Sequence, residues 1–160
     1  LPLDTYVEFT GAGTMRFADF VNGGAARDVL ERIVVKKHDY RASFQCLRNS
    51  ATDFSTLNAC AALWDGQWHL AVGARPKKAK FLEDEDLGLP ARFSPEELDA
   101  ACQRARDLNY GTDRRASAAY RAELAEVLSR RAILEAAAQQ DVATELRLAA
   151  EAAKPKGVSA

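Results

Sequence analysis

The 160 residues, 48% apolar and 28% charged, suit one soluble domain or one domain with a tail. A net charge of -1 excludes a global field that recruits nucleic acid or anionic membrane, and no apolar run approaches the roughly 20 residues of a membrane span. The three cysteines are dispersed, which favours reduced thiols in a cytoplasmic protein. Neither His38 nor His69 lies near a cysteine at metal-ligand spacing, so no metal site is expected.

The N-terminal part of the chain predicts strands. Residues 5–10 alternate in polarity, 11–13 form a glycine turn, and 15–17 return as a short strand. A lone hairpin is marginal without a sheet, so its partner strands are expected to be missing or to lie elsewhere in the fold. Another strand is predicted at 30–35, whereas residues 40–47 fit a short helix or a strand equally well.

Two alternating runs on either side of Asp65-Gly66 predict a β-hairpin, because both central positions of such a turn favour positive φ. In the return strand Trp68, Leu70 and Val72 share one face, and the strand ends at Gly73. A polar bend flanked by Arg48 and Asp53 leads into the hairpin. Its amides and its carboxylate suit a flat, hydrogen-bonding ligand, and an ordinary surface loop is the alternative interpretation.

Helical patterns follow the strands. We expect a short helix at 77–83, a helix that begins at the capping box of Ser94 and Glu97, and a third helix at about 116–137. The buried stripe of the third helix is predicted to be Tyr120, Leu124, Val127, Leu128 and Leu134. The order of elements favours an α+β fold, with a small antiparallel sheet of three to four strands packed on about three helices.

Several ordered segments carry a resemblance to a known family. They are residues 16–23 with 29–33, the bend 48–55, the strand end 72–76, and the helix start 113–121 with its continuation to 132. From residue 16 to 136 the chain resembles the C-terminal domain of the FAD-binding (medium) subunit of the molybdenum hydroxylases, the carbon monoxide dehydrogenase and xanthine dehydrogenase flavoproteins. The family has an α+β fold, which agrees with the pattern of elements.

The resemblance implies a division of the chain into three parts. Residues 1–17 would be a remnant of the closing strands of a preceding FAD-binding domain, 18–137 the flavoprotein C-terminal domain, and 138–160 a helical or frayed tail. The glycine-rich loops that hold the FAD pyrophosphate would lie in the preceding domain. We therefore expect this fragment to retain FAD weakly or not at all and not to be catalytic alone.

The resemblance also implies cofactor-binding residues. Asp53 would hydrogen-bond the polar edge of the isoalloxazine ring, while Leu70, Val72 and Gly73 would approach the ring through backbone and apolar contact. Arg48 would orient the bend. The parent oxidoreductase would pass electrons from iron–sulfur clusters to FAD and then to an acceptor, with a molybdopterin-binding large subunit and an iron–sulfur small subunit as partners.

Two other functions are compatible with the sequence. The alanine-rich helix at 116–153 favours a non-catalytic protein-interaction module that uses its helical layer. A small stand-alone enzyme is less favoured, because no set of residues forms a catalytic constellation. The bend discriminates between the first two hypotheses, because only the flavoprotein interpretation requires Asp53 to lie beside an open, concave site.

Overall fold

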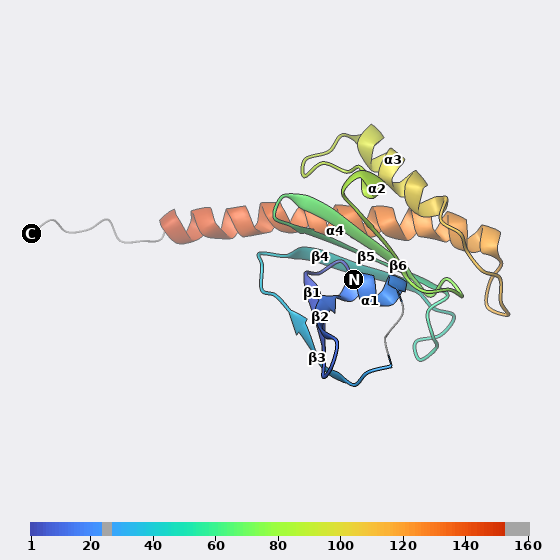
Figure 1. Ribbon diagram of the computed structural model, residues 1–160. Helices are drawn as coiled ribbons and strands as arrows, with labels where there is room; N and C mark the ends of the chain where they lie inside the picture. The colour runs from blue at the N-terminus through green and yellow to red at the C-terminus, as the bar shows by residue number, and fades with distance from the viewer. Residues whose placement is uncertain (24–26, 153–160) are drawn as a thin grey trace, which may run out of the picture.

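The computed structural model describes residues 1–23 and 27–152, with residues 140–152 described by their backbone alone. Two antiparallel sheets and the helices that flank them form an α+β fold, as the order of sequence patterns predicts (Figure 1). The elements are β1 (Thr5–Phe9), β2 (Gly13–Arg16), α1 (Phe17–Gly23), β3 (Leu30–Val35), β4 (Arg41–Leu47), β5 (Leu57–Trp64), β6 (Gln67–Gly73), β7 (Lys80–Glu83), α2 (Asp84–Leu87), α3 (Pro95–Arg106) and α4 (Ala118–Ala152).

The smaller sheet has the strand order β2-β1-β3. Its central strand β1 buries Val7 and Phe9, and the ring of Phe9 packs on Phe20 of α1 with 5.4 Å between ring centroids. The predicted strand at 30–35 is confirmed as β3, and it pairs with β1 along the edge opposite β2. The N-terminal hairpin therefore finds its third strand within this chain.

The larger sheet has the order β4-β5-β6-β7, with every neighbouring pair antiparallel. The turn between β5 and β6 is confirmed, because Asp65 and Gly66 have φ angles of 49° and 76°. Residues 41–47, which the sequence left undecided, form β4. They pair with β5 along their whole length, so tertiary pairing decides between two locally possible structures.

The helix predicted at 77–83 is wrong, because residues 80–83 form the edge strand β7. Lysine, alanine and glutamate have high helix propensity, yet a helix this short is marginal in isolation. As a strand, the segment completes the hydrogen-bond ladder of β6 and points Leu82 into the core. Its neighbour Phe81 points to the other face, where it stacks on His69.

Helices α3 and α4 cover one face of the larger sheet (Figure 1). Helix α3 begins as predicted, with Ser94 and Glu97 forming both hydrogen bonds of a capping box. Helix α4 continues through Ala152, so the part of the predicted tail up to that residue is helical, and residues 153–160 lie outside the described residues. None of the described helices is long and apolar enough to cross a membrane.

The predicted buried stripe of α4 is largely wrong. Only Leu128 is fully buried, Leu124 is partly buried, and Tyr120, Val127 and Leu134 are 50%, 43% and 47% exposed. The buried side of α4 consists mainly of small residues, namely Ala125, Ser129, Ala132 and Ala136, together with Arg121, Leu128 and Ile133. Small side chains let the helix approach the sheet closely. The positions of the largest apolar residues therefore do not indicate which side of α4 is buried.

Arg121 is the largest polar group in the core and is 0% exposed. Its Nε donates to the carbonyl of Thr56 at 3.0 Å, and its Nη1 donates to the carbonyls of Gly111 and Ala116, each at 2.8 Å. Its Nη2 donates to Asp113 Oδ1 at 2.7 Å. The hydrogen bond from Arg121 is the main cause that lowers the pKa of Asp113 to about 2.

We predict that Ala132→Leu lowers the free energy of unfolding by about 1–3 kcal/mol, because added methyl groups overfill a closely packed interface. Leu134→Ala is the matched control on the exposed face, with an expected change within about 0.5 kcal/mol. Denaturant titration of both variants measures the difference. A destabilised Leu134→Ala with an unaffected Ala132→Leu would show that the opposite face of α4 is buried.

We predict that Asp113→Asn destabilises the fold at neutral pH and that the difference from wild type shrinks in acid. The pKa of Asp113 is lowered on folding, so its carboxylate contributes stability above the ordinary value of 3.8 and loses this contribution as the pH falls toward about 2. Unfolding curves between pH 7 and pH 2 measure it. Asp39→Asn, at an exposed aspartate, is the control and should stay close to wild type at every pH. A difference for Asp113→Asn that is constant over this range would contradict the prediction.

Candidate functional site

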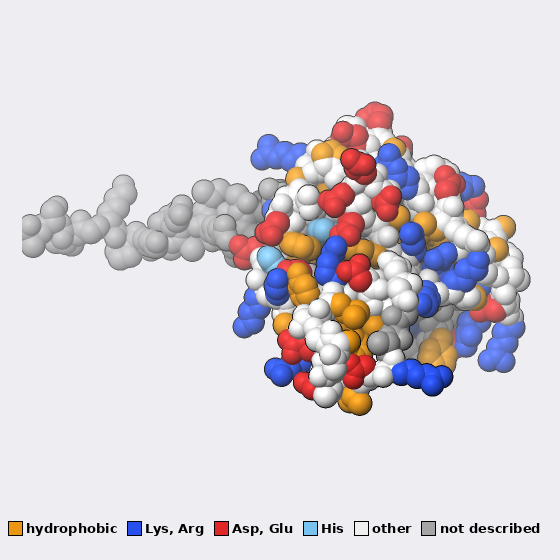
Figure 2. Space-filling view, in the orientation of Figure 1, with side chains coloured by type: hydrophobic (Ala, Val, Ile, Leu, Met, Phe, Trp, Pro, Cys, Tyr) orange, Lys and Arg blue, Asp and Glu red, His pale blue; other side chains and the backbone are white. Residues whose placement is uncertain are grey.

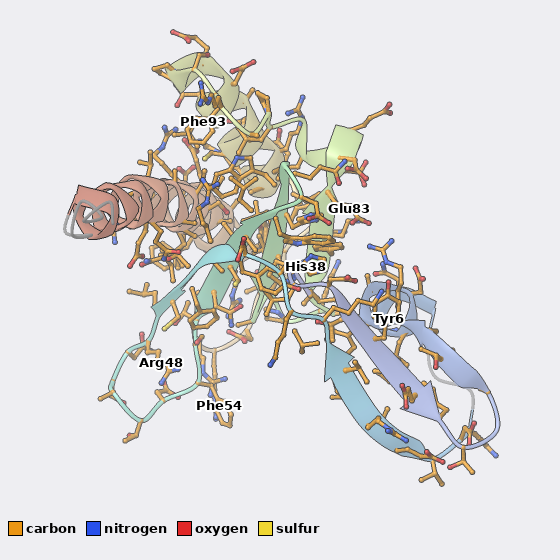
Figure 3. The ribbon with its side chains drawn as sticks, turned by 90° about the vertical axis from the view of Figure 1, so that its left-hand side faces the viewer. Tyr6, His38, Arg48, Phe54, Glu83 and Phe93 are labelled. Atoms are coloured by element: carbon orange, nitrogen blue, oxygen red, sulfur yellow. The ribbon has the colours of Figure 1, made fainter. Side chains whose placement is uncertain are left out.

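The polar bend forms the loop between β4 and β5. The amide of Thr56 donates to the carbonyl of Leu47 at 2.8 Å and closes the loop at its base, while the amide of Asp53 donates to the carbonyl of Ser50 at 3.2 Å. Figure 3 shows the loop extending away from the sheet, with Arg48 and Phe54 on its two arms. The Arg121 hydrogen bond to Thr56 then ties the base of the loop to α4.

Asp53 and Arg48 have different surroundings within this loop. Arg48 Nη1 donates to the carbonyl of Ala51 at 3.4 Å, so its guanidinium braces the bend. Asp53 Oδ1 accepts the amide hydrogen of Phe54 at 2.7 Å and lies 3.5 Å from Nη2 of Arg115. Both recorded contacts involve Oδ1, so among the described residues Oδ2 has no hydrogen-bond partner.

Asp53 borders a polar cleft of about 410 Å³. The other residues that line this polar cleft are Arg48, Thr52, Phe54, Ser55, Asn58 and Ala74. Hydroxyl, amide, guanidinium and carboxylate groups therefore surround one hollow at the entry to the hairpin. This is the chemistry that binds the hydrogen-bonding edge of a planar ligand.

A second hollow, an apolar groove of about 520 Å³, lies on the face of the larger sheet that is turned away from α3 and α4. One wall comes from the chain start and α1, namely Leu1, Pro2, Leu3, Phe17 and Val21. The other comes from the sheet and its β6–β7 connection, namely Ala42, Phe44, Asn58, Cys60, Ala71, Gly73 and Ala79. Four of these sheet-side residues are alanine or glycine, so much of this wall is low and flat.

Asn58 lines both the polar cleft and the apolar groove. It pairs with Gly73 across β5 and β6, and a Cβ atom at Gly73 would lie 2.5 Å from Asn58 Oδ1. Glycine at 73 therefore leaves the space that the Asn58 amide occupies. Sequence reasoning did not single out Asn58, although it is the only strongly polar residue on the outward face of β5, opposite a glycine.

The predicted site residues fall into two groups. Asp53 borders the polar cleft and Gly73 the apolar groove, and Asn58 connects them. Leu70 and Val72 are 0% exposed and pack in the core against the helices, so their side chains border neither hollow. A ligand in the groove would contact only the backbone of these two residues. Their contact with a cofactor therefore stays a prediction.

Cys60 is the thiol that borders the groove, and burial raises its pKa. A thiol that stays protonated is a poor nucleophile and a poor metal ligand, so Cys60 contributes apolar surface. Among the described residues, no group of histidine, cysteine and acidic side chains has the arrangement of a metal site.

The residues around the two hollows can be compared with what an isoalloxazine ring requires. Such a ring is planar, with an apolar face and a hydrogen-bonding edge, and sites for it combine apolar contact with a few fixed polar groups. The low wall at Ala71, Gly73 and Ala79 meets the first requirement, and Asn58 and Asp53 meet the second. Gly11-Ala12-Gly13, in contrast, lies at the turn between β1 and β2, so it lacks the strand–helix setting of a phosphate-binding loop.

Solved structures with the same fold include a quinoline 2-oxidoreductase and carbon monoxide dehydrogenases. Quinoline 2-oxidoreductase from Pseudomonas putida 86 matches with a TM-score of 0.66 and 21% identity, over 87% of this chain and 53% of that chain. A carbon monoxide dehydrogenase from Hydrogenophaga pseudoflava, which lacks the Mo-pyranopterin moiety of its molybdenum cofactor, matches with a TM-score of 0.65 and 20% identity, over 86% and 54%. Carbon monoxide dehydrogenase from Oligotropha carboxidovorans matches with a TM-score of 0.63 and 20% identity, over 85% and 54%.

These likenesses show the fold, and the chain spans about half the length of the structures it matches. Among curated protein sequences, none matches the chain. The sequence profile of the CO dehydrogenase flavoprotein C-terminal domain matches residues 42–136, which include both sides of the polar cleft, the whole larger sheet except Arg41, and α3. The resemblance inferred from the sequence is thereby confirmed, and the chain belongs to the family of CO dehydrogenase flavoprotein C-terminal domains.

Proposed function

We propose that this chain is the C-terminal part of the FAD-binding subunit of a molybdenum-dependent dehydrogenase or hydroxylase, and that it closes over the flavin ring. One observation carries the proposal. Asp53 lies at a polar cleft, and Asn58 lines both this cleft and the flat-walled apolar groove. The flavoprotein hypothesis requires an open, concave site beside Asp53. Family membership and the shared fold support the same conclusion.

Each group at the site has a role in this proposal. Asp53 and Asn58 orient the polar edge of the ring, Gly73 and the neighbouring alanines contact its face, and Leu70 and Val72 contribute backbone. The apolar wall excludes water from the ring. When bound, FAD would supply the redox centre that passes electrons from iron–sulfur clusters to an acceptor.

We also propose the partners and the domain division that the resemblance implies. The complete subunit would assemble with a molybdopterin-binding large subunit and an iron–sulfur small subunit. Residues 1–17 would close a preceding FAD-binding domain, and residues 30–35 would accompany them, because β3 pairs with β1. Residues up to 137 would form the C-terminal domain, with 138–160 as its tail.

One observation favours a second function, that of a protein-interaction module. Tyr120, Val127 and Leu134 recur every seven residues on α4 and are about half exposed. They form an apolar line on a helix, a surface that suits a partner helix. Weaker association of purified subunits in Val127→Asp, with flavin content unchanged, would support this module, and unchanged association would remove it.

We predict that this chain alone binds FAD weakly or not at all, since the described residues contribute a wall for the ring without a glycine-rich phosphate loop. Titration of the chain with FAD, followed by flavin fluorescence, measures the affinity. A chain that purifies with stoichiometric flavin absorbance would contradict the prediction.

We predict that Asp53→Ala and Asn58→Ala each weaken FAD binding by the complete subunit about 5- to 10-fold, the effect of losing one hydrogen bond worth about 1 kcal/mol. Asp39→Ala is the matched control, because Asp39 is exposed and borders a different hollow. Flavin occupancy after dialysis and the FAD dissociation constant are the readouts. Occupancy and affinity equal to wild type in both site variants would remove the two hollows as the flavin site.

A further inference from the structure

Arg115 lies beside the carboxylate on which the proposed site depends. Its Nη2 is 3.5 Å from Asp53 Oδ1, and its guanidinium lies over the ring of Phe54, 5.6 Å from the ring centroid. We propose that Arg115 is a positioning residue that fixes the orientation of the Asp53 carboxylate and balances its charge beside the flavin. The inference rests on the proposed function and adds a residue that borders neither hollow.

The contacts divide the two oxygens of Asp53. Oδ1 is engaged by the Phe54 amide at 2.7 Å and by Arg115 at 3.5 Å. Asp53 also lines the polar cleft, and Oδ2 has no hydrogen-bond partner among the described residues, so we assign Oδ2 to the ligand. One oxygen thus serves the protein and the other is available to a ligand. A carboxylate that rotated freely would present either oxygen and would lose this orientation.

The backbone of Arg115 is held by residues that also fix the loop. Its amide donates to Asp113 Oδ1 at 2.8 Å, and the same oxygen accepts from Arg121. Arg121 in turn holds the carbonyl of Thr56 at the base of the loop. The backbone near each residue of the Asp53–Arg115 pair is therefore tied to one buried guanidinium, which limits how far the two chain segments can separate.

The charge of Arg115 matters because it is fixed close to a partly buried carboxylate. The side chains of Arg115 and Asp53 are 24% and 30% exposed, so solvent screens the pair only in part. Arg48 also borders the polar cleft, but its recorded hydrogen bond goes to the carbonyl of Ala51. Among the described residues, Arg115 is thus the cation that forms an ion pair with Asp53.

This arrangement predicts opposite effects on a bound flavin. Reduction adds negative charge to the ring, so an unbalanced carboxylate nearby disfavours the reduced form and an unbalanced guanidinium favours it. Arg115→Met should lower the reduction potential, and Asp53→Asn should raise it. The double variant has no charge at either position and should return close to wild type.

The experiment measures the midpoint potential of FAD in the complete subunit for wild type, Arg115→Met, Arg115→Lys, Asp53→Asn and the double variant. We expect each neutral single variant to change the ratio of the affinities for reduced and oxidised flavin about tenfold, which is about 30 mV for a two-electron couple. Arg115→Lys keeps the charge and should stay near wild type. Arg114→Met, at the exposed neighbouring arginine, is the control and should also stay near wild type.

The outcomes separate the inference from the proposed function. A shift in Asp53→Asn without a shift in Arg115→Met overturns the role of Arg115 and leaves the flavin site standing. No shift in Asp53→Asn overturns both. A double variant that departs from wild type further than either single variant also overturns the inference, because it indicates damage to the loop rather than charge balance.

A readout without flavin tests the positioning role in this chain alone. If Arg115 holds Asp53 Oδ1, the amide hydrogen of Phe54 should exchange with solvent severalfold faster in Arg115→Met than in wild type or Arg114→Met. Equal exchange rates in all three would overturn the positioning role.

Discussion

The buried guanidinium of Arg121 is the interaction on which the rest of the site depends. A charge without solvent exposure is tolerated only where hydrogen bonds and an opposite charge surround it, and Arg121 has three carbonyl acceptors and Asp113. Those acceptors come from the base of the β4–β5 loop and from the segment that precedes α4. A single side chain thereby joins the loop, the entry to the hairpin and the long helix, so the position of the polar cleft follows from the packing of α4.

Strands β5 and β6 serve two different surfaces. Leu57, Ala59 and Ala61 on one face, with Leu70 and Val72, pack against the helices, and small side chains on α4 allow a close approach. The other face carries Asn58, Cys60, Ala71 and Gly73 and borders the groove. Because side chains alternate along the strands, one face of the sheet contributes to the core and the other borders the proposed binding groove.

Much of this fold could be predicted from local patterns. The hairpin turn, the capping box of α3 and the strand at 30–35 depend on residues that are close in sequence, and the structure confirms them. The short segment at 80–83 could not be predicted, because pairing with β6 outweighs its helix propensity. The buried side of α4 could not be predicted either, since alanine and serine make up most of it while the large apolar residues Tyr120, Val127 and Leu134 are about half exposed. Within the site, the polar bend was recognisable from the sequence, whereas the importance of Asn58 and Arg115 arises from contacts across the sheet and across the chain.

Polar contacts connect the N-terminal part of the chain with the larger sheet and the segment that leads into it. Arg16 pairs with Glu83 at 3.0 Å, His38 lies 3.0 Å from Asp4, and the Trp64 indole donates to the carbonyl of Pro2. On the face of the molecule seen in Figure 2, acidic and basic side chains are interspersed and no large area has a single sign. Because one wall of the apolar groove comes from the chain start and α1 and the other from the larger sheet, the width of the groove depends on how these two parts of the chain pack against each other.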